Sequence, residues 1–182
     1  MVIHMNRFNI YLILVPLFAM ALGCKSTEGK DWNALSTLQL HIEAKADPFD
    51  RTETVEVYRE SPVKFTVDKV PFLSEATVKD AKVIDVTGGF ALQIEFDRQG
   101  SWLLEQYTSA NHRKHIVIFS QFANRGEEKI NQGRWLAAPQ IQKHISDGVF
   151  IFTPDATREE SERIALGLNH VAQRLATGKA IK

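Results

Sequence analysis

The sequence is poor in cysteine, because its 182 residues contain a single one, Cys24. No disulfide can therefore form within the chain, and the fold must rest on its apolar core. An excess of charge of one sign is also missing, since 22 basic side chains balance 22 acidic ones. This balance argues against a broad nucleic-acid-binding surface, which needs a clustered basic excess. Apolar residues make up 44% and charged residues 24% of the chain, proportions typical of a globular protein.

The apolar run near the start of the sequence is too short for an ordinary membrane-spanning helix. Residues 8–23 are almost all apolar, but this run has roughly 16 residues and contains Pro16, whereas a spanning helix needs about 20. Arg7 precedes the run, and polar residues follow it from Lys25 onward. A basic start, a short apolar stretch and small residues before a polar continuation are typical of a secretory signal.

Residues 21–24 read Ala-Leu-Gly-Cys and resemble the lipobox of bacterial lipoproteins, with alanine in place of the commoner leucine. The resemblance implies cleavage before Cys24 and acylation of that cysteine. We therefore expect a signal peptide at residues 1–23, a polar tether at residues 24–33, and a body held by lipid on the periplasmic side of the inner or outer membrane. By the same resemblance, Lys25 favours the outer membrane. The alternative is an ordinary secretory peptide followed by an incidental cysteine.

Motifs typical of hydrolases and nucleotide-binding proteins are missing as well. Neither Ser120 nor Ser146 lies in a Gly-x-Ser-x-Gly context, and no partner histidine and carboxylate can be assigned to them. Gly88 and Gly89 lack the spacing and the following helix of a phosphate-binding loop. The acidic residues of positions 155–162 fit the start of a helix, where carboxylates stabilise its positive end. The sequence therefore predicts no catalytic residue and no cofactor site.

The histidines do not form a recognisable metal site. His112 and His115 stand three positions apart with two basic residues between them, which disfavours the binding of a cation. Zinc needs several converging ligands, and acylation of the one cysteine leaves none of that type. His41, His144 and His170 fall at positions that we expect to lie on the surface. We therefore predict no metal site.

Alternation of apolar and polar residues predicts a strand-rich front section over residues 34–70. Apolar side chains recur at every second position within residues 38–44, 55–58 and 63–67, the pattern of strands buried on one face. Pro71 closes this section.

Residues 71–176 are expected to contain both strands and helices, followed by a tail at residues 177–182. Strands are predicted at 83–86, 90–96, 116–119 and 149–152, with a tight hairpin connection at Gly88-Gly89 and a loop at 124–133. Short helices are predicted at 74–81, capped by Ser74, and at 101–110, capped by Ser101. The spacing of Thr157 and Glu160 predicts a capping box that begins a long C-terminal helix. The expected fold is one α+β domain with a mostly antiparallel or mixed sheet.

Five segments occur in a distinctive order: PFLSEATVKDAKV, GGFALQIEFDRQGSWLLEQYTSAN, HIVIFS, LAAPQIQKHISDG and FTPDATREESERIALGLN. This ordered set resembles the periplasmic head subdomain of SecD, the accessory protein of the bacterial Sec translocon, and it extends over about residues 70–175. The resemblance implies the fold of that head and contact with a polypeptide or a partner surface outside the inner membrane. SecD also has many transmembrane helices, which nothing in this sequence matches, so we do not expect a translocation motor.

These observations predict a non-enzymatic binding or scaffold module of the cell envelope that contacts exported polypeptides or envelope proteins. Pro139 marks residues 135–141 as an edge strand, to which an extended peptide can add. The aromatic residues of the second half are expected mostly in the core, but Phe150 and Phe152 alternate with Val149 and Ile151, so one of these two pairs can face outward. The predicted contact residues are Trp135, Pro139, Ile141, Phe150 and Phe152. The alternatives are helices that cover both sheet faces and leave no groove, an envelope hydrolase with a site built from loops, and a purely structural lipoprotein.

Overall fold

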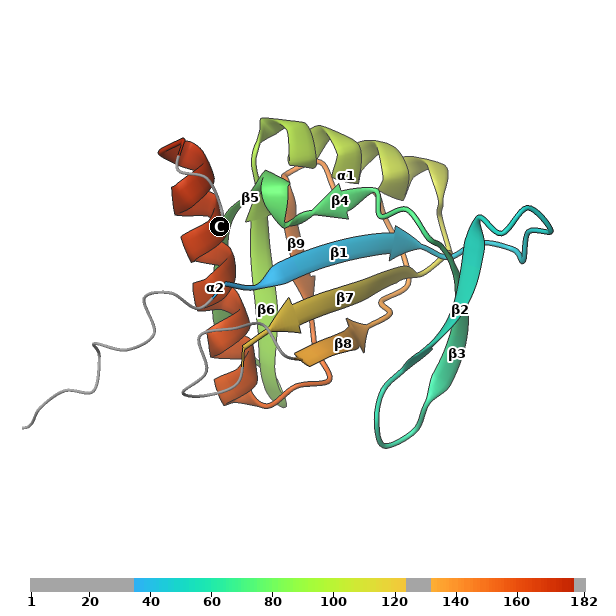
Figure 1. Ribbon diagram of the computed structural model, residues 1–182, viewed down its shortest axis with the longest axis horizontal. Coiled ribbons are helices and arrows are strands. Elements are labelled where there is room, and N and C mark those ends of the chain that lie inside the picture. Colours follow the sequence, from blue (N-terminus) through green and yellow to red (C-terminus); the bar gives the residue numbers. More distant parts are fainter. Residues whose placement is uncertain (1–34, 124–131, 179–182) are drawn as a thin grey trace, which may run out of the picture. The chain divides into compact units, whose positions relative to one another are not determined.

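The computed structural model describes residues 35–123 and 132–178 of the chain. The expected leader, nearly all of the tether, most of the expected 124–133 loop and the end of the tail lie outside these residues. A first antiparallel sheet has the strand order β4-β1-β7-β8 (Figure 1). Its strands are β1 (Thr37–Ile42), β4 (Leu73–Ser74), β7 (Ile116–Phe122) and β8 (Gln132–Ala137).

A second antiparallel sheet has the order β5-β6-β9, and its strands cross behind those of the first sheet in Figure 1. It consists of β5 (Val78–Val86), β6 (Gly89–Phe96) and β9 (Val149–Phe152). Thr87 and Gly88 connect β5 to β6 in a tight hairpin, one residue earlier than the predicted Gly88-Gly89. Gly88 has a φ of 88°, a left-handed conformation that glycine adopts without strain.

A separate hairpin, formed by β2 (Thr52–Val57) and β3 (Val63–Asp68), covers the outer face of the first sheet. Val57 and Val67 are fully buried there against Val117 of β7 and against Ala138. Because successive side chains of a strand alternate between faces, Val117 points to this outer layer while its neighbours Ile116 and Ile118 point to the main core. The central strand β7 is thus buried on both faces, as its continuous apolar run predicts.

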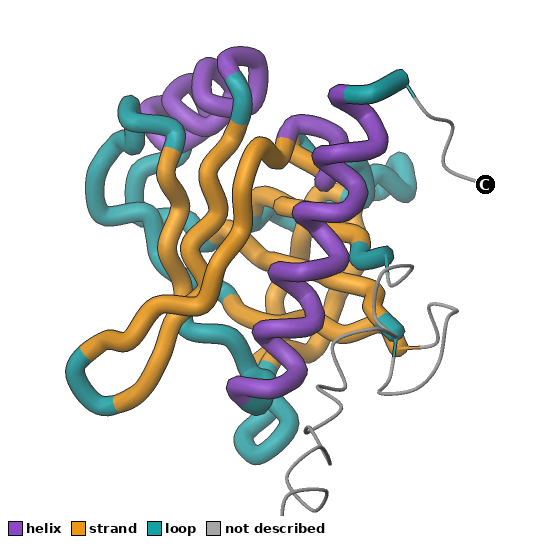
Figure 2. Tube along the Cα trace, turned by 90° about the vertical axis from the view of Figure 1, so that its left-hand side faces the viewer, coloured by secondary structure: helices purple, strands orange, loops and turns teal. Residues whose placement is uncertain are grey.

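Two helices complete the described structure, α1 (Arg98–Ala110) and α2 (Arg158–Ala176). Figure 2 shows α2 lying along one side of the strands. The amide side chain of Asn169 on α2 bonds both backbone groups of Ala81 on β5, each at 2.8 Å. The start of α2 has the predicted capping box, since Thr157 accepts from the Glu160 N–H and the Glu160 carboxylate accepts from the Thr157 N–H.

The main core lies between the two sheets and the two helices. Its apolar side chains come from β1, β4 to β9, α1 and α2. The largest of them that are fully buried are Phe122, Leu38, Leu40, Leu92, Ile94, Leu104, Ile116, Ile118, Leu136, Ile164 and Leu168. The α+β class, the antiparallel sheets and the long C-terminal helix are confirmed.

One predicted helix and the predicted start of another are wrong. Residues 74–81 form β4, a single 3₁₀ turn at Glu75–Thr77 and the beginning of β5, because Val78 and Ala81 are buried in the ladder with β6. Helix α1 begins at Arg98, before the predicted Ser101, because the Asp97 carboxylate accepts from the Gly100 N–H at 2.8 Å.

Two of the histidines expected at the surface are buried. His41 is 3% exposed because the β2–β3 hairpin covers its face of β1, and its Nδ1 donates to the Asp68 carbonyl at 2.7 Å. His170 is 8% exposed on α2. His144 is exposed, as predicted.

Candidate functional site

The five predicted contact residues do not share one surface. Trp135 lies half-buried in the outer layer, where its ring contacts those of His41 and Phe119 at centroid distances of 5.2 and 5.0 Å. Phe150 and Phe152 are each 4% exposed and belong to the main core, whereas Ile151 between them is 49% exposed. Of the two parity pairs of β9, the pair that contains Ile151 is thus the one that faces solvent, and Phe150 and Phe152 are too buried to form an exposed contact surface.

The edge predicted at residues 135–141 is occupied. β8 is an edge strand, but the outer side of this segment already has hydrogen-bond partners. On that side, Leu136 C=O accepts from Asp155 N–H at 2.6 Å, and Ala138 N–H donates to the Tyr58 hydroxyl at 3.2 Å. The Ile141 N–H donates to Lys114 C=O at 2.8 Å on the other side, where the segment pairs with the residues before β7. The outer side of residues 136–138 is thus unavailable to an added strand without displacement of the contacts with Asp155 and Tyr58.

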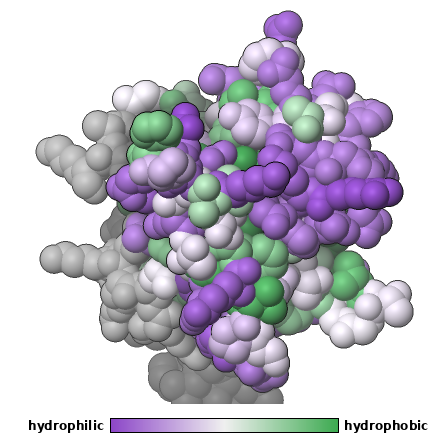
Figure 3. Space-filling view, turned by 90° about the vertical axis from the view of Figure 1, so that its right-hand side faces the viewer, coloured by the Kyte–Doolittle hydropathy of each residue, from purple (hydrophilic) through white to green (hydrophobic). Residues whose placement is uncertain are grey.

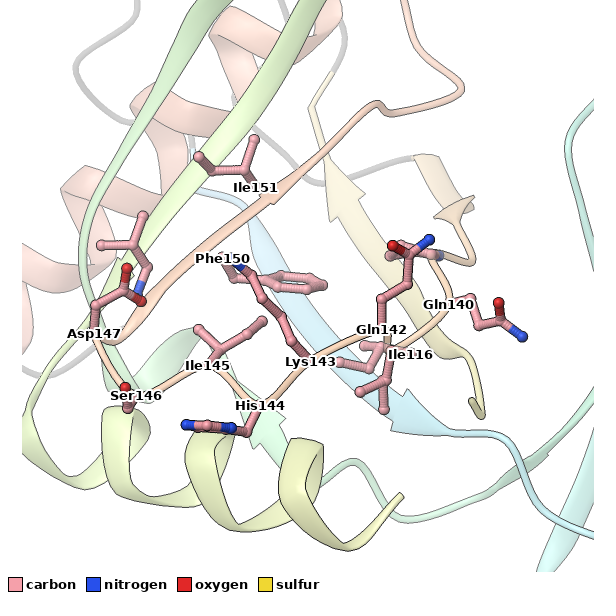
Figure 4. Close-up of a pocket in the computed structure, with 13 residues that line it drawn as sticks. Ile116, Gln140, Gln142, Lys143, His144, Ile145, Ser146, Asp147, Phe150 and Ile151 are labelled. Carbon is pink, nitrogen blue, oxygen red and sulfur yellow. The ribbon is translucent and has the colours of Figure 1, made fainter. Parts of the chain in front are cut away.

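Three of the predicted residues nevertheless line a common cavity of about 470 Å³ beside β9. We call this cavity the β9 slot; residues 139–147 and 149–151 line it together with Ile116 (Figure 4). Pro139, Ile141 and Phe150 belong to it, and Trp135 and Phe152 do not. Its volume lies within the range of about 300–1,000 Å³ typical of ligand sites.

The floor of the β9 slot is apolar and its rim is polar. Ile116, Ile141 and Phe150 form the floor and are 1%, 4% and 4% exposed. In the view of Figure 4, the long Lys143 side chain crosses in front of the Phe150 ring, and both residues line the slot. Thr108 of α1 accepts from the Ile145 N–H at 3.0 Å and thereby fixes the loop that carries the rim.

The rim contains His144, Ser146 and Asp147, three residue types found in hydrolytic triads. Their geometry differs from that of a triad. The Asp147 carboxylate accepts from the Val149 N–H at 3.1 Å, and no hydrogen bond between described residues joins His144 to Ser146 or Asp147. The slot thus provides apolar contact and polar anchoring, and its described residues do not form a hydrogen-bonded nucleophile and base.

Carboxylates with shifted pKa values lie elsewhere. Burial raises the pKa of Glu43, but hydrogen bonds from the ring and backbone N–H of His115 lower it more, so this pKa lies below its ordinary value. A hydrogen bond from Arg134 outweighs burial and holds the pKa of Glu160 below its ordinary value. Both carboxylates connect structural elements. Glu43 joins the end of β1 to the start of β7, and Glu160 joins α2 to β8.

Sequence reasoning missed Lys143, Ile145, Asp147 and Ile151 as members of the site. The available signal was the alternation in β9, which assigns Ile151 and Phe150 to opposite faces but does not say which face is covered. Other large apolar side chains are exposed outside the slot, among them Phe49 before β2, Val70 after β3 and Trp102 on α1. On the side that carries the β2–β3 hairpin, hydrophilic residues surround small apolar patches (Figure 3).

Two further properties concern the described residues only. No group of three or more histidine, cysteine, aspartate and glutamate side chains converges there in a way that could hold a metal ion. Neither α1 nor α2 combines the length and the apolar character needed to cross a membrane, and no other described helix does.

Comparison with solved structures relates the fold to SecDF. One structure, described as "Structure and function of a membrane component SecDF that enhances protein export", has 20% sequence identity and a TM-score of 0.51 over 76% of this chain and 64% of that one. Another, "Crystal structure of SecDF in Super-membrane-facing form", has 20% identity and a TM-score of 0.51 over 74% of this chain and 19% of that one. This chain therefore spans less than two thirds of either protein, and the likeness at this identity is one of fold.

No curated protein matches the sequence significantly. The family model of the SecDF P1 head subdomain, in contrast, matches residues 52–172, from the start of β2 into α2. The match includes the β2–β3 hairpin, α1, most of α2 and every residue that lines the β9 slot. Because it extends over more than half of the sequence, the chain belongs to the SecDF P1 head subdomain family.

Proposed function

We propose that this protein is a non-catalytic module of the cell envelope that binds segments of exported polypeptides in the β9 slot. The observation that supports this proposal most is the slot itself, in which an apolar floor lies under a polar rim beside an exposed Ile151. Membership of the SecDF P1 head family supports a role related to protein export. The related structure is described as a membrane component that enhances protein export. For this chain, we propose a contribution to export through the binding of polypeptides.

Cys24 supplies the proposed attachment to a membrane outside the cytoplasm. Its Ala-Leu-Gly-Cys context supports cleavage after residue 23 and acylation of the thiol, with residues 24–33 as the tether. Each buried methylene of an acyl chain contributes about 0.8 kcal/mol, and stable attachment needs two or more chains. The tether then leads into β1, which begins at Thr37.

Polypeptide binding is tested by the fluorescence anisotropy of a labelled, reduced and carboxymethylated polypeptide that stays unfolded, titrated with the full chain. We expect saturable binding in the micromolar range, and no binding of the same polypeptide in its folded form. Unchanged anisotropy up to high micromolar concentration contradicts the proposed function.

Acylation is tested by mass spectrometry of the protein purified from its own membranes, beside a Cys24→Ser variant. We expect the natural protein to begin at Cys24 with a mass increased by acyl groups, and the variant to leave the membrane fraction or to retain its leader. A free thiol at Cys24 in the purified natural protein contradicts the proposed anchor.

A further inference from the structure

The edges of the two sheets differ in how they are covered. On the second sheet, α2 covers the β5 edge, where the Asn169 amide bonds both backbone groups of Ala81. On the first sheet, the Asp155 N–H donates to Leu136 C=O at the β8 edge. The edge of β9 faces the β9 slot instead of a neighbouring strand.

The pairing of β9 with β6 determines which of its backbone groups face that slot. Phe96 N–H donates to Gly148 C=O at 3.0 Å, so these two residues form a hydrogen-bonded pair of the antiparallel ladder. Such pairs alternate with pairs that exchange no hydrogen bonds, so the pairs Ile94–Phe150 and Leu92–Phe152 are bonded as well. The N–H and C=O groups of Val149 and Ile151 must then point away from β6, toward the slot.

One of these four backbone groups has a partner within the chain. The Asp147 carboxylate accepts from the Val149 N–H at 3.1 Å, which caps the start of the edge. Among the described residues, no hydrogen bond reaches the C=O of Val149 or either backbone group of Ile151. The edge therefore offers one donor and two acceptors in the spacing of a strand, next to an apolar cavity.

We propose that the β9 slot binds an extended polypeptide segment as an additional antiparallel strand on β9. This inference rests on the proposed polypeptide binding and adds the conformation in which the polypeptide is bound. Backbone hydrogen bonds to Val149 and Ile151 supply affinity for any extended chain, and pockets beneath alternate side chains supply selectivity. Residues of the segment that bond Ile151 share its outward face. Residues between them place their side chains on the Phe150 side, above the apolar floor.

Charge favours an acidic residue in this segment. Lys143 is the one lysine or arginine that lines the slot, and no ion pair between described residues involves it. The carboxylate of Asp147, in contrast, is directed to the Val149 N–H. The preferred occupant is thus an extended segment with apolar residues at every second position and a carboxylate within reach of Lys143.

The test uses an acetylated and amidated peptide that alternates valine with threonine and ends in aspartate at both sides, titrated against the full chain by calorimetry. In antiparallel addition, valines enter the slot and threonine N–H groups bond β9. N-methylation of the threonines should therefore weaken binding about tenfold or more, whereas N-methylation of the valines should leave it nearly unchanged. A counterpart with lysine in place of aspartate should bind more weakly, and Lys143→Glu should reverse that preference.

A matched pair of variants tests the edge from the side of the protein. Ile151→Pro removes an N–H that points away from β6, a position where an edge strand tolerates proline. Ile151→Val retains that N–H and the β-branched side chain. We expect Ile151→Pro to lower the affinity for the peptide about tenfold and Ile151→Val to change it little, with unchanged far-ultraviolet circular dichroism for both.

The outcomes separate this inference from the proposed function. Equal binding of both N-methylated peptides, or selective loss with methylated valines, overturns antiparallel strand addition while polypeptide binding stands. Antiparallel strand addition is also overturned if the unmethylated peptide does not bind while an unfolded polypeptide does. If neither the peptide nor the unfolded polypeptide binds, the proposed function itself fails.

Discussion

Glu160 shows how one side chain joins separate elements. It completes the capping box of α2 with Thr157 and forms an ion pair with Arg134 of β8, with 3.0 Å between Oε1 and Nη2. The side chains of Arg134 and Glu160 are 17% and 15% exposed, so water screens this pair less than a pair at the surface. The Thr-x-x-Glu spacing reveals the capping box, but the ion pair depends on β8 lying beside the start of α2, which no local pattern shows.

We predict that Glu160→Gln lowers the free energy of unfolding by about 1 to 2 kcal/mol, between the values for surface and buried pairs. Glutamine retains the capping-box acceptor, so the loss reports the ion pair with Arg134. Urea unfolding followed by circular dichroism measures the change. The control is Glu159→Gln in the same helical turn, where Glu159 is 60% exposed and the expected loss is below about 0.5 kcal/mol.

The same pair predicts a pH dependence. The pKa of Glu160 is lower in the folded protein than in the unfolded chain, because Arg134 bonds its carboxylate. Its contribution to stability is therefore present above the unfolded value of about 4.3 and is lost as the pH falls through the folded value. The difference in unfolding free energy between wild type and Glu160→Gln should narrow from about pH 7 to about pH 3. If this difference in unfolding free energy stays constant between about pH 7 and about pH 3, Glu160 does not stabilise the fold through its ionised carboxylate.

His41 shows where the sequence pattern fails at the scale of residues. It alternates with the buried Leu40 and Ile42, which led to the expectation of a surface position. The alternation is correct, but its face of β1 is covered by a second layer in which His41 contacts Trp135. The period of a strand assigns residues to faces and does not reveal whether a distant hairpin covers one of them.

Among the elements, the β2–β3 hairpin owes its position mainly to apolar packing. Val57 is fully buried against the first sheet, whereas its cross-strand partner Val63 is 46% exposed. The polar contact at the hairpin end, between Arg59 and Asp155, lies 3.2 Å apart, with the Arg59 side chain 54% exposed. An exposed pair of this kind contributes about 0 to 1 kcal/mol, less than one buried valine.

We therefore predict that Val57→Ala lowers the free energy of unfolding by about 2 kcal/mol and that Val63→Ala changes it by less than about 0.5 kcal/mol. Both substitutions remove the same atoms from paired positions of one ladder, so strand propensity is matched. Urea unfolding followed by tryptophan fluorescence, with Trp135 near the hairpin, measures both. Equal losses at the two positions would show that the hairpin is not held by its buried face.

Most strands and the long helix could be predicted because their periodicity is local. The alternation in β6 and the capping box of α2 are properties of a few neighbouring residues. The expected helix at 74–81 failed because tertiary pairing decided the outcome: Val78 and Ala81 contribute more when buried in the ladder with β6 than a short, marginal helix would. Local propensity is a weak guide for such a short segment.

At the scale of the molecule, the proposed binding site depends on which sheet edges are covered. The resemblance in the second half of the sequence predicted the family, and the site was placed at one edge strand. Asp155 and Tyr58 occupy the outer side of residues 136–138, so we propose the site at β9 in place of β8. Which edge stays open depends on where loops from distant parts of the chain lie, and periodicity carries no information about this.

Crosslinking in living cells tests the central claim that the β9 slot meets polypeptides outside the cytoplasm. A photo-reactive residue is placed at position 151, beside the slot, and, as a matched control, at position 166 on α2; Ile151 and Leu166 are 49% and 39% exposed. We predict that position 151 crosslinks to exported polypeptides identified by mass spectrometry and that position 166 does not. Equal crosslinking from both positions, or none from position 151, contradicts the account.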